Sequence, residues 1–167
     1  ALACASHGGE PEHVRIAARM LEQLGLEEGD LACGAHEPLA ARGVRSLREN
    51  GQRPTRLHNN CSGKHAAMLA RARQSGIPTA GYQRAEQQDC LQAVAEWAAL
   101  PSERIGVGVD GCGVSVFALP LANMALAYAR LVQAAASGDS PSRRVVSAMT
   151  SQPFLVGGTE RFDTVLM

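Results

Sequence analysis

The order of helical and strand-like segments is the feature of this sequence that most constrains its fold. Helical spacing of apolar residues dominates, and a Gly-rich connection joins two strand-like stretches, residues 104–110 and 114–119, as a hairpin. A doubly wound parallel sheet would instead need strands and helices in regular alternation. The pattern therefore favours an α+β or mixed α/β fold.

Apolar residues at three- and four-residue intervals indicate where the helices lie. The spacing predicts helices over residues 11–24, 40–49, 62–74, 85–100, 120–136 and 140–150. Residues 1–6 are predicted as a short buried strand that leads into a turn. Because the sequence begins and ends on apolar residues, we expect a fragment that lacks the N- and C-terminal parts of a longer protein.

Length and charge bound the possible functions. The 167 residues carry 16 basic and 16 acidic side chains, so the formal net charge is zero, and we expect a single domain over residues 1–167. Without a basic stripe or a long apolar run, the sequence favours neither nucleic-acid nor membrane partners. Five cysteines without a CxxC pair, and no signal-peptide pattern, predict reduced thiols and a cytoplasmic location.

The densest group of reactive side chains is the segment His58-Asn-Asn-Cys-Ser-Gly-Lys-His65, at the predicted start of a helix. A helix N-terminus favours an anion such as a thiolate or a carboxylate. Cys61 and Lys64 lie three residues apart on one helical face, where they could share a metal or act as nucleophile and base. Lys64 is the single lysine of the sequence, and lysine, unlike arginine, can lose its proton. The alternative is a capping loop with a structural cysteine.

A second group occupies the hairpin connection Gly108-Val-Asp-Gly-Cys-Gly113. Glycine lets the backbone approach a ligand closely, so this connection could bring Asp110 and Cys112 into a cleft. If it meets the segment before the third predicted helix, Cys61, Lys64 and Cys112 offer three ligands for zinc. The alternative is a plain tight turn between two strands.

Two further polar segments stand near the two ends of the sequence. In Ser6-His-Gly-Gly-Glu10, a serine at a strand end before a sharp turn could be a nucleophile, and Glu10 is interpreted as an acid of a helix's first turn. Sequence neighbours rarely supply triad geometry, so His7 beside Ser6 predicts no triad. In residues 157–164, Arg161 could bind a carboxylate, and the alternative is a solvated turn.

Taken in order, these segments resemble the Rhizobium etli-type L-asparaginases. The similarity covers nearly the whole chain through Ser6-His-Gly-Gly-Glu-Pro with His13, Cys33-Gly-Ala-His36, the stretch from His58 to Leu69, Gly108-Val-Asp-Gly-Cys-Gly113, and Gly158-Thr-Glu-Arg161. The segments around Cys61 and Cys112 are specific, whereas the others alone would be weak. The resemblance implies an amidohydrolase that converts L-asparagine to L-aspartate and ammonia, with a fold similar to the serine β-lactamases and glutaminases.

The resemblance also implies roles for individual residues. Ser6 matches the serine of a catalytic Ser-Lys arrangement. The zinc ligands of the family match Cys61, Lys64 and Cys112, and further polar residues of its catalytic site match Asp110 and His65. Zinc is therefore the expected cofactor.

Asn59, Asn60 and Arg161 are expected to bind the substrate, L-asparagine, and the family suggests a homodimer. The family's site also uses an upstream Ser-x-x-Lys pair and a downstream lysine, whereas this sequence has one lysine. Three hypotheses follow. The protein is an asparaginase with Ser6 as nucleophile near zinc, an amidase of the same fold with another substrate, or an inactive domain that binds zinc or an amino acid.

Overall fold

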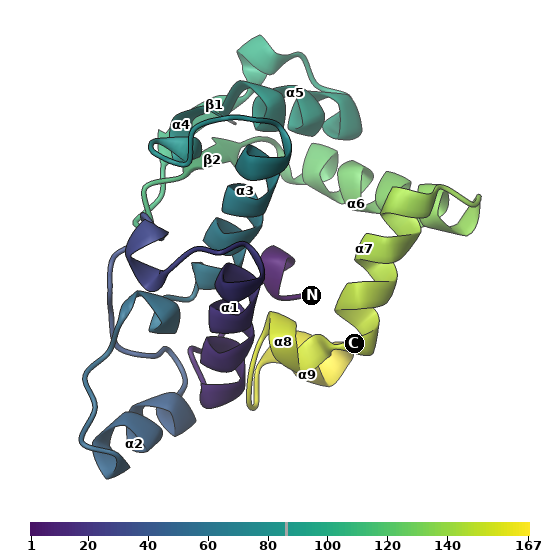
Figure 1. Cartoon of the computed structure of the whole chain (residues 1–167). Helices are drawn as coiled ribbons and strands as arrows, with labels where there is room; N and C mark the ends of the chain where they lie inside the picture. The colour runs from purple at the N-terminus through teal and green to yellow at the C-terminus, as the bar shows by residue number, and fades with distance from the viewer. Residues whose placement is uncertain (86) are drawn as a thin grey trace. The chain divides into compact units, whose positions relative to one another are not determined.

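The computed structural model describes residues 1–85 and 87–167, which form two compact units (Figure 1). The first unit comprises Ala1–Tyr82 and Met149–Met167, and the second comprises Gln83–Ala148. Both are mostly helical, and the second contains a two-stranded sheet. This content of helices and strands agrees with the expected α+β class. A β-lactamase-like fold and a single domain over residues 1–167 stay predictions.

The first unit is built on two long helices, α1 (Pro11–Gln23) and α3 (Ser62–Gln74), which pack against each other. Shorter elements complete it: the helices α2 (Ala41–Glu49), α8 (Pro153–Val156) and α9 (Phe162–Leu166), and the 3-10 turns η1 (Leu2–Cys4), η2 (Glu28–Asp30) and η3 (Arg56–His58). The predictions of helices over 11–24, 40–49 and 62–74 are confirmed by α1, α2 and α3.

The prediction of a strand over residues 1–6 is wrong. Leu2–Cys4 form the turn η1, and Leu2 and Ala5 pack against Ala17 of α1. The turn also lies against the start of α3, where a Cβ on Gly63 would lie 2.5 Å from the Leu2 backbone oxygen. A short apolar run indicates burial without telling a strand from another buried segment. Glycine at position 63 therefore lets η1 bring the following residues to the start of α3.

A buried carboxylate joins the two sequence segments of the first unit. Glu10 accepts hydrogen bonds from the Thr159 backbone N–H at 2.7 Å, the Thr159 hydroxyl at 2.6 Å and the Arg42 guanidinium at 3.0 Å. Burial raises the pKa of Glu10, but these hydrogen bonds outweigh burial and hold the pKa below its usual value. Gly158 completes the fit, since its φ is 112° and a Cβ there would lie 2.5 Å from Glu10 Oε1.

The second unit packs the helices α5 (Gln87–Ala98) and α6 (Leu121–Ala136) with the hairpin of β1 (Gly106–Val109) and β2 (Ser115–Ala118). The strands are antiparallel, with Gly106 opposite Ala118, which confirms the predicted hairpin. The core contains Ala98, Leu100 and Ile105. The turn η4 (Ser102–Arg104) precedes β1, and the helices α4 (Tyr82–Ala85) and α7 (Ser140–Ser151) cross the sequence limits of the unit.

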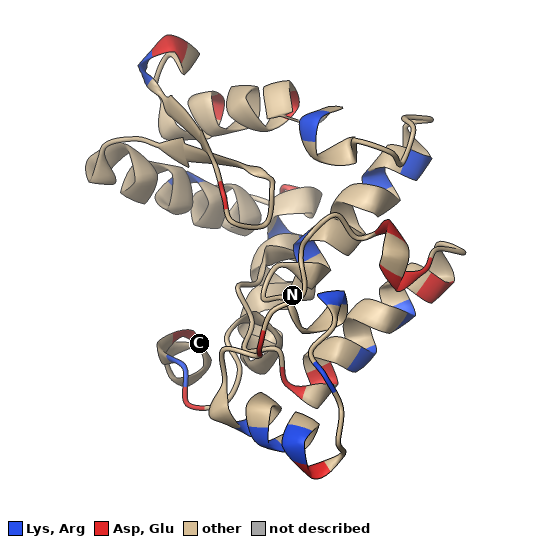
Figure 2. Ribbon diagram, turned by 90° about the vertical axis from the view of Figure 1, so that its left-hand side faces the viewer, with Lys and Arg blue, Asp and Glu red and all other residues tan. Residues whose placement is uncertain are grey.

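The helices predicted over 120–136 and 140–150 are confirmed by α6 and α7. The helix predicted over 85–100 corresponds to α5, and residue 86 of that prediction lies outside the described residues. Acidic and basic residues occur in both units (Figure 2). Among the described residues, no helix combines the length and apolar character needed to cross a bilayer.

The buried Glu10 carboxylate predicts a specific loss of stability. In Glu10→Gln the charge disappears and the amide N–H group faces donors from Thr159 or Arg42. We expect the free energy of unfolding to fall by about 2–3 kcal/mol, because a buried hydrogen-bonding group is then left unmatched. Urea denaturation monitored by circular dichroism measures this change.

Glu12→Gln is the matched control for this measurement. Glu12 also pairs with Arg42, at 2.6 Å, but its side chain is 40% exposed. Loss of a surface ion pair lowers the free energy of unfolding by less than about 1 kcal/mol. Equal losses of stability in the two variants would contradict the role assigned to Glu10.

Candidate active site

Ser6, the predicted nucleophile, lies beside the segment that precedes α3. The Asn60 side-chain amide donates a hydrogen bond to Ser6 Oγ at 2.9 Å, across 54 positions of sequence. The His7 backbone N–H donates to the Asn60 carbonyl at 3.2 Å. Ser6 is exposed, whereas His7 is fully buried. The first unit therefore brings together two of the sequence motifs and leaves the serine hydroxyl open to solvent.

His36 extends this contact into a chain of hydrogen bonds. Its Nδ1 donates to the Glu37 carbonyl at 2.6 Å, and its Nε2 lies 3.0 Å from the side-chain oxygen of Asn60. The Asn60 backbone N–H donates to the same ring nitrogen at 3.3 Å. Sequence reasoning assigned His36 no role. Its place in a segment shared with the asparaginases was the available signal, and spacing along the chain does not predict its pairing with Asn60.

His7, next to Ser6, is held inside the protein. Its Nδ1 accepts the Gly9 backbone N–H at 3.1 Å, so the ring proton resides on Nε2, 3.0 Å from the Ser62 hydroxyl oxygen. Burial, together with the nearby His13 and His36, lowers the pKa of His7 to about 3. His7 therefore remains neutral at physiological pH and fixes the backbone that follows Ser6.

His13 makes a second connection between the two segments of the first unit. Its Nδ1 accepts the Glu10 backbone N–H at 3.1 Å, and its Nε2 donates to the Phe154 carbonyl at 2.9 Å. The ring stacks on His7, with centroids 4.8 Å apart, and on Phe154, with centroids 4.9 Å apart. These contacts fix the start of α1, which the Ser6 segment enters.

The other residues predicted to bind substrate differ from Asn60 in their surroundings. Asn59 is buried, its Nδ2 donates to the Gly34 carbonyl at 2.7 Å, and its Oδ1 accepts the Cys61 backbone N–H at 2.8 Å. Both ends of this amide thus bind the protein, and the oxygen closes a local turn onto the backbone two residues on. Arg161 is exposed and directly precedes α9. Substrate binding by Asn59 or Arg161 stays a prediction.

The start of α3 carries three residues predicted for zinc binding or catalysis. Cys61 is the buried N-cap, and Lys64 is half-buried in the first turn. His65 is fully buried, with Nδ1 2.5 Å from the Tyr82 hydroxyl oxygen. That oxygen also accepts the Ala32 backbone N–H at 3.0 Å. His65 is therefore held by α3 and Tyr82.

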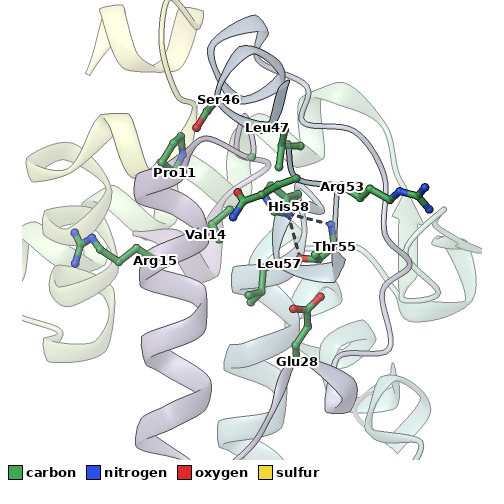
Figure 3. A pocket seen from close by; sticks show the side chains of 13 residues that line it. Pro11, Val14, Arg15, Glu28, Ser46, Leu47, Arg53, Thr55, Leu57 and His58 are labelled. Carbon is green, nitrogen blue, oxygen red and sulfur yellow. Dashed lines mark hydrogen bonds between the residues drawn. The ribbon is translucent and has the colours of Figure 1, made fainter. Parts of the chain in front are cut away.

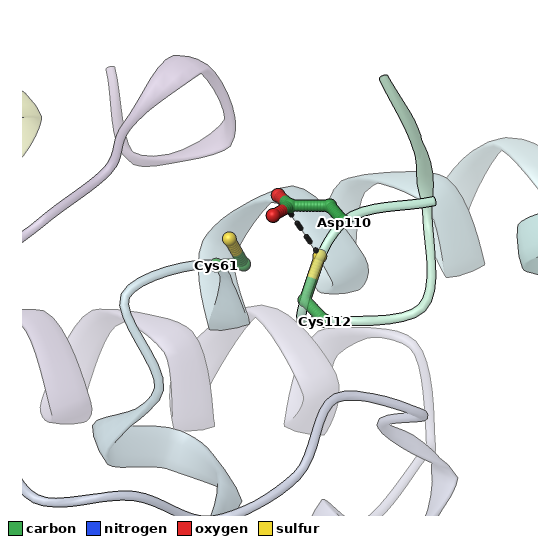
Figure 4. A group of neighbouring side chains, drawn as sticks. All are labelled: Cys61, Asp110 and Cys112. Carbon is green, nitrogen blue, oxygen red and sulfur yellow. Dashed lines mark hydrogen bonds between the residues drawn. The ribbon is translucent and has the colours of Figure 1, made fainter. Parts of the chain in front are cut away.

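In the second unit, Asp110 and Cys112 lie in the turn between β1 and β2. The Cys112 thiol donates to Asp110 Oδ2 at 3.6 Å, and Asp110 Oδ1 accepts the Gly111 N–H at 2.8 Å. Figure 4 shows this thiol and carboxylate, and also draws Cys61 at the start of α3. Cys112 is buried while Asp110 is exposed. The turn thus gathers a sulfur and an oxygen donor, both suited to a divalent metal.

The first unit also has a cavity of about 600 Å³ beside His58 (Figure 3). Apolar side chains such as Val14 and Leu47 line it, and among the described residues its lining includes neither Ser6 nor Asn60. His58 Nδ1 accepts the Thr55 backbone N–H at 3.0 Å. Burial lowers the pKa of His58 and outweighs the opposing effect of the Glu28 charge. The cavity is therefore separate from the Ser6–Asn60 contact.

The neutral, buried His7 predicts that the protein loses stability in weak acid. A histidine in the unfolded chain titrates near 6.5, whereas His7 in the native protein titrates near 3. Between these values the unfolded state binds the extra proton, so the free energy of unfolding falls as the pH falls. The slope attributable to His7 approaches about 1.4 kcal/mol per pH unit.

Urea denaturation between about pH 7 and pH 5, above the range in which carboxylates such as Glu10 become protonated, measures this slope. His7→Gln lacks the titrating ring, so we expect its stability to depend less on pH in this range. An identical pH dependence in the two proteins would contradict the assignment of a neutral His7.

We compared the sequence with known protein families, and the match covers the whole chain. The family model for L-asparaginase II matches residues 1–167, which include the Ser6, Cys61, Cys112 and Gly158 segments. No curated protein matches the sequence. The narrower Rhizobium etli-type assignment stays a prediction. The chain belongs to the L-asparaginase II family.

Proposed function

We propose that the protein hydrolyses the side-chain amide of L-asparagine to L-aspartate and ammonia, with Ser6 as the nucleophile. The family suggests asparagine amidohydrolase activity. The observation that carries the role of Ser6 is the 2.9 Å hydrogen bond from Asn60 to its exposed hydroxyl oxygen. A nucleophile has to be accessible and held in a defined position; the exposure of Ser6 meets the first requirement and this hydrogen bond the second.

The proposed reaction proceeds through an ester of Ser6. Ser6 Oγ attacks the amide carbon, the C–N bond breaks, and the serine proton passes through a base to the departing ammonia. Water then cleaves the ester, releasing aspartate and restoring the hydroxyl. The Asn60 N–H that points at Oγ stabilises the negative charge that develops there as the proton leaves.

His7 is adjacent to Ser6 but does not supply the base. Its pKa of about 3 makes it a poor proton acceptor, and its Nδ1, which carries the ring lone pair, already accepts the Gly9 N–H. The family resemblance assigns the base to a lysine, whereas Lys64 is expected among the zinc ligands. We therefore leave His7 and Lys64 outside the proton-transfer step.

We also propose that Cys61, Lys64 and Cys112 bind zinc. Cysteine thiolates are common zinc ligands, and the amine of Lys64, an unusual ligand, can join them once it has lost its proton. Cys61 is the N-cap of α3, Lys64 follows in its first turn, and the Cys112 thiol hydrogen-bonds the Asp110 carboxylate, and these positions support the proposal. When bound, zinc would act as a Lewis acid that polarises a substrate group.

The remaining proposed roles rest on the resemblance. Asp110 and His65 are proposed as polar residues of the catalytic site, and Asn59 and Asn60 as contacts of the substrate. The guanidinium of Arg161, exposed before α9, has the fork geometry that binds a carboxylate such as that of asparagine. A homodimer and a cytoplasmic location belong to the same proposal.

Ammonia release from L-asparagine by the full-length protein tests the reaction. Ser6→Ala removes the nucleophile, so we expect kcat to fall by at least about a thousandfold. Ser75→Ala, at an exposed serine that ends α3, is the matched control and should keep the native rate. A Ser6→Ala protein that retains its activity would exclude Ser6 as the nucleophile.

The same assay separates the alternatives. A panel of L-asparagine, L-glutamine and acyl-peptides identifies the substrate, and a clear preference for another amide would favour an amidase of different specificity. If the native protein binds zinc and L-asparagine without releasing ammonia, the hydrolase proposal is wrong and the protein is a binding domain.

Removing one thiol tests the zinc proposal. We expect Cys112→Ser to lower the zinc affinity by at least about tenfold and to raise KM for L-asparagine, because a ligand is lost. Metal analysis after dialysis against a weak chelator measures the zinc content. Cys4→Ser removes an exposed thiol instead and should leave the zinc content unchanged. Unchanged zinc in Cys112→Ser would remove Cys112 from the ligand set.

A further inference from the structure

Ser6 lies in a stretch of chain that forms neither helix nor strand, between η1 and the start of α1. Its position therefore depends on contacts with another segment, and residues 57–62 provide them. The Asn60 amide contacts Ser6 Oγ at 2.9 Å, and the His7 backbone N–H donates to the Asn60 carbonyl at 3.2 Å. A third hydrogen bond joins the His7 ring to the Ser62 hydroxyl at 3.0 Å. Two of these three contacts pass through His7.

The hydrogen bonds around Ser62 determine where each proton lies. The Ser62 hydroxyl donates to the Leu57 carbonyl at 3.0 Å, so its oxygen accepts from His7. His7 Nε2 carries the ring proton because Nδ1 accepts the Gly9 N–H. Ser62 and His7 are both fully buried, and a buried donor without its acceptor is destabilising. Each donor from Gly9 to Leu57 therefore has its acceptor, and this arrangement depends on the Ser62 hydroxyl.

Both ends of this chain of hydrogen bonds are backbone groups, which move only with their segments. The first follows Ser6 by three residues, and the Leu57 carbonyl belongs to η3. Ser62 itself begins α3, so its hydroxyl ties the stretch after Ser6 to η3 and to α3. The His7 ring and the N–H that binds Asn60 belong to one residue. A shift of the ring away from Ser62 would therefore move this N–H and, with it, the adjacent Ser6.

We propose that Ser62 is a positioning residue that acts through His7 to hold Ser6 against Asn60. The inference rests on the proposed role of Ser6 as nucleophile. In this scheme Ser62 touches neither Ser6 nor the substrate, and it sets where the nucleophile lies. Loss of the Ser62 hydroxyl therefore weakens the chemical step more than substrate binding, because a displaced nucleophile reacts more slowly.

Ser62→Ala tests the proposal in the full-length protein. We expect kcat for ammonia release from L-asparagine to fall about 10- to 100-fold, with KM within about twofold of the native value. The variant also becomes less stable, because the His7 Nε2–H and the Leu57 carbonyl lose a partner. Rates are measured at a temperature where circular dichroism shows each variant folded.

Leu21→Val is the matched control for stability. It shortens a buried side chain of α1 that takes no part in these hydrogen bonds. We expect a lower Tm and the native kcat. If Leu21→Val lowers kcat as much as Ser62→Ala does, a general loss of stability accounts for the effect and the proposal is overturned.

Two substitutions of His7 test the same contact from its other side, and they do so even if Ser62→Ala does not fold. His7→Gln places an amide N–H near the position of Nε2, within reach of Ser62, whereas the shorter His7→Asn does not reach Ser62. We expect kcat within about fivefold of the native value for His7→Gln and about 10- to 100-fold lower for His7→Asn. Equal kcat values in the two variants would overturn the proposal. Adding Ser62→Ala to His7→Asn should lower kcat no further, and additive losses would also overturn it.

The outcomes distinguish this inference from the proposed function. If Ser6→Ala keeps its activity, the proposed function fails, and a crystal structure of Ser62→Ala still tests the placement of Ser6. The contact between the Asn60 amide and Ser6 Oγ should lengthen beyond about 3.5 Å in that structure, and its persistence would overturn the proposal. If Ser6→Ala is inactive and Ser62→Ala has the native kcat, the proposed function stands and the role of Ser62 is wrong.

Discussion

The buried carboxylate of Glu10 is the interaction on which the rest of the first unit depends. A charge without exposure to water is strongly destabilising unless hydrogen bonds and an opposite charge match it. Thr159 and Arg42 provide that match, and the requirement ties the segment 149–167 to the start of α1. Ser6 stands four residues before Glu10, so its backbone position follows from the same requirement.

Two histidines near Ser6 differ in burial and in hydrogen-bond partners, so the same residue type has a different structural role at each position. His7 is buried, neutral and fully occupied inside the protein, where it hydrogen-bonds Ser62 and the backbone. His36 is half-buried and connects the Glu37 carbonyl with the Asn60 side chain. One ring therefore stabilises the fold, whereas the other reaches the exposed serine through an amide.

Periodic patterns predicted the helices and the hairpin because both structures are local. Residues 1–6 were predicted wrongly because their apolar character reflects packing of η1 on Gly63 and α1, a contact between segments. Asn59 and Asn60 show that local sequence also fails to predict the partners of single side chains. Both are asparagines before a helix, yet Asn59 is buried in a local turn and Asn60 faces Ser6. The direction of one side chain in a turn depends on the fold around it.

Glu10 was interpreted from sequence as an acid that favours the start of a helix, which describes its position and misses its partners. The partner Thr159 lies 149 residues away along the chain. Closing so long a loop is entropically costly, and contacts of this kind slow folding. During synthesis the Glu10 carboxylate remains hydrated until residue 159 has been added. The contact between Ser6 and Asn60 needs only residues up to 60, whereas the charge of Glu10 gains its Thr159 partner when the last part of the unit has been made.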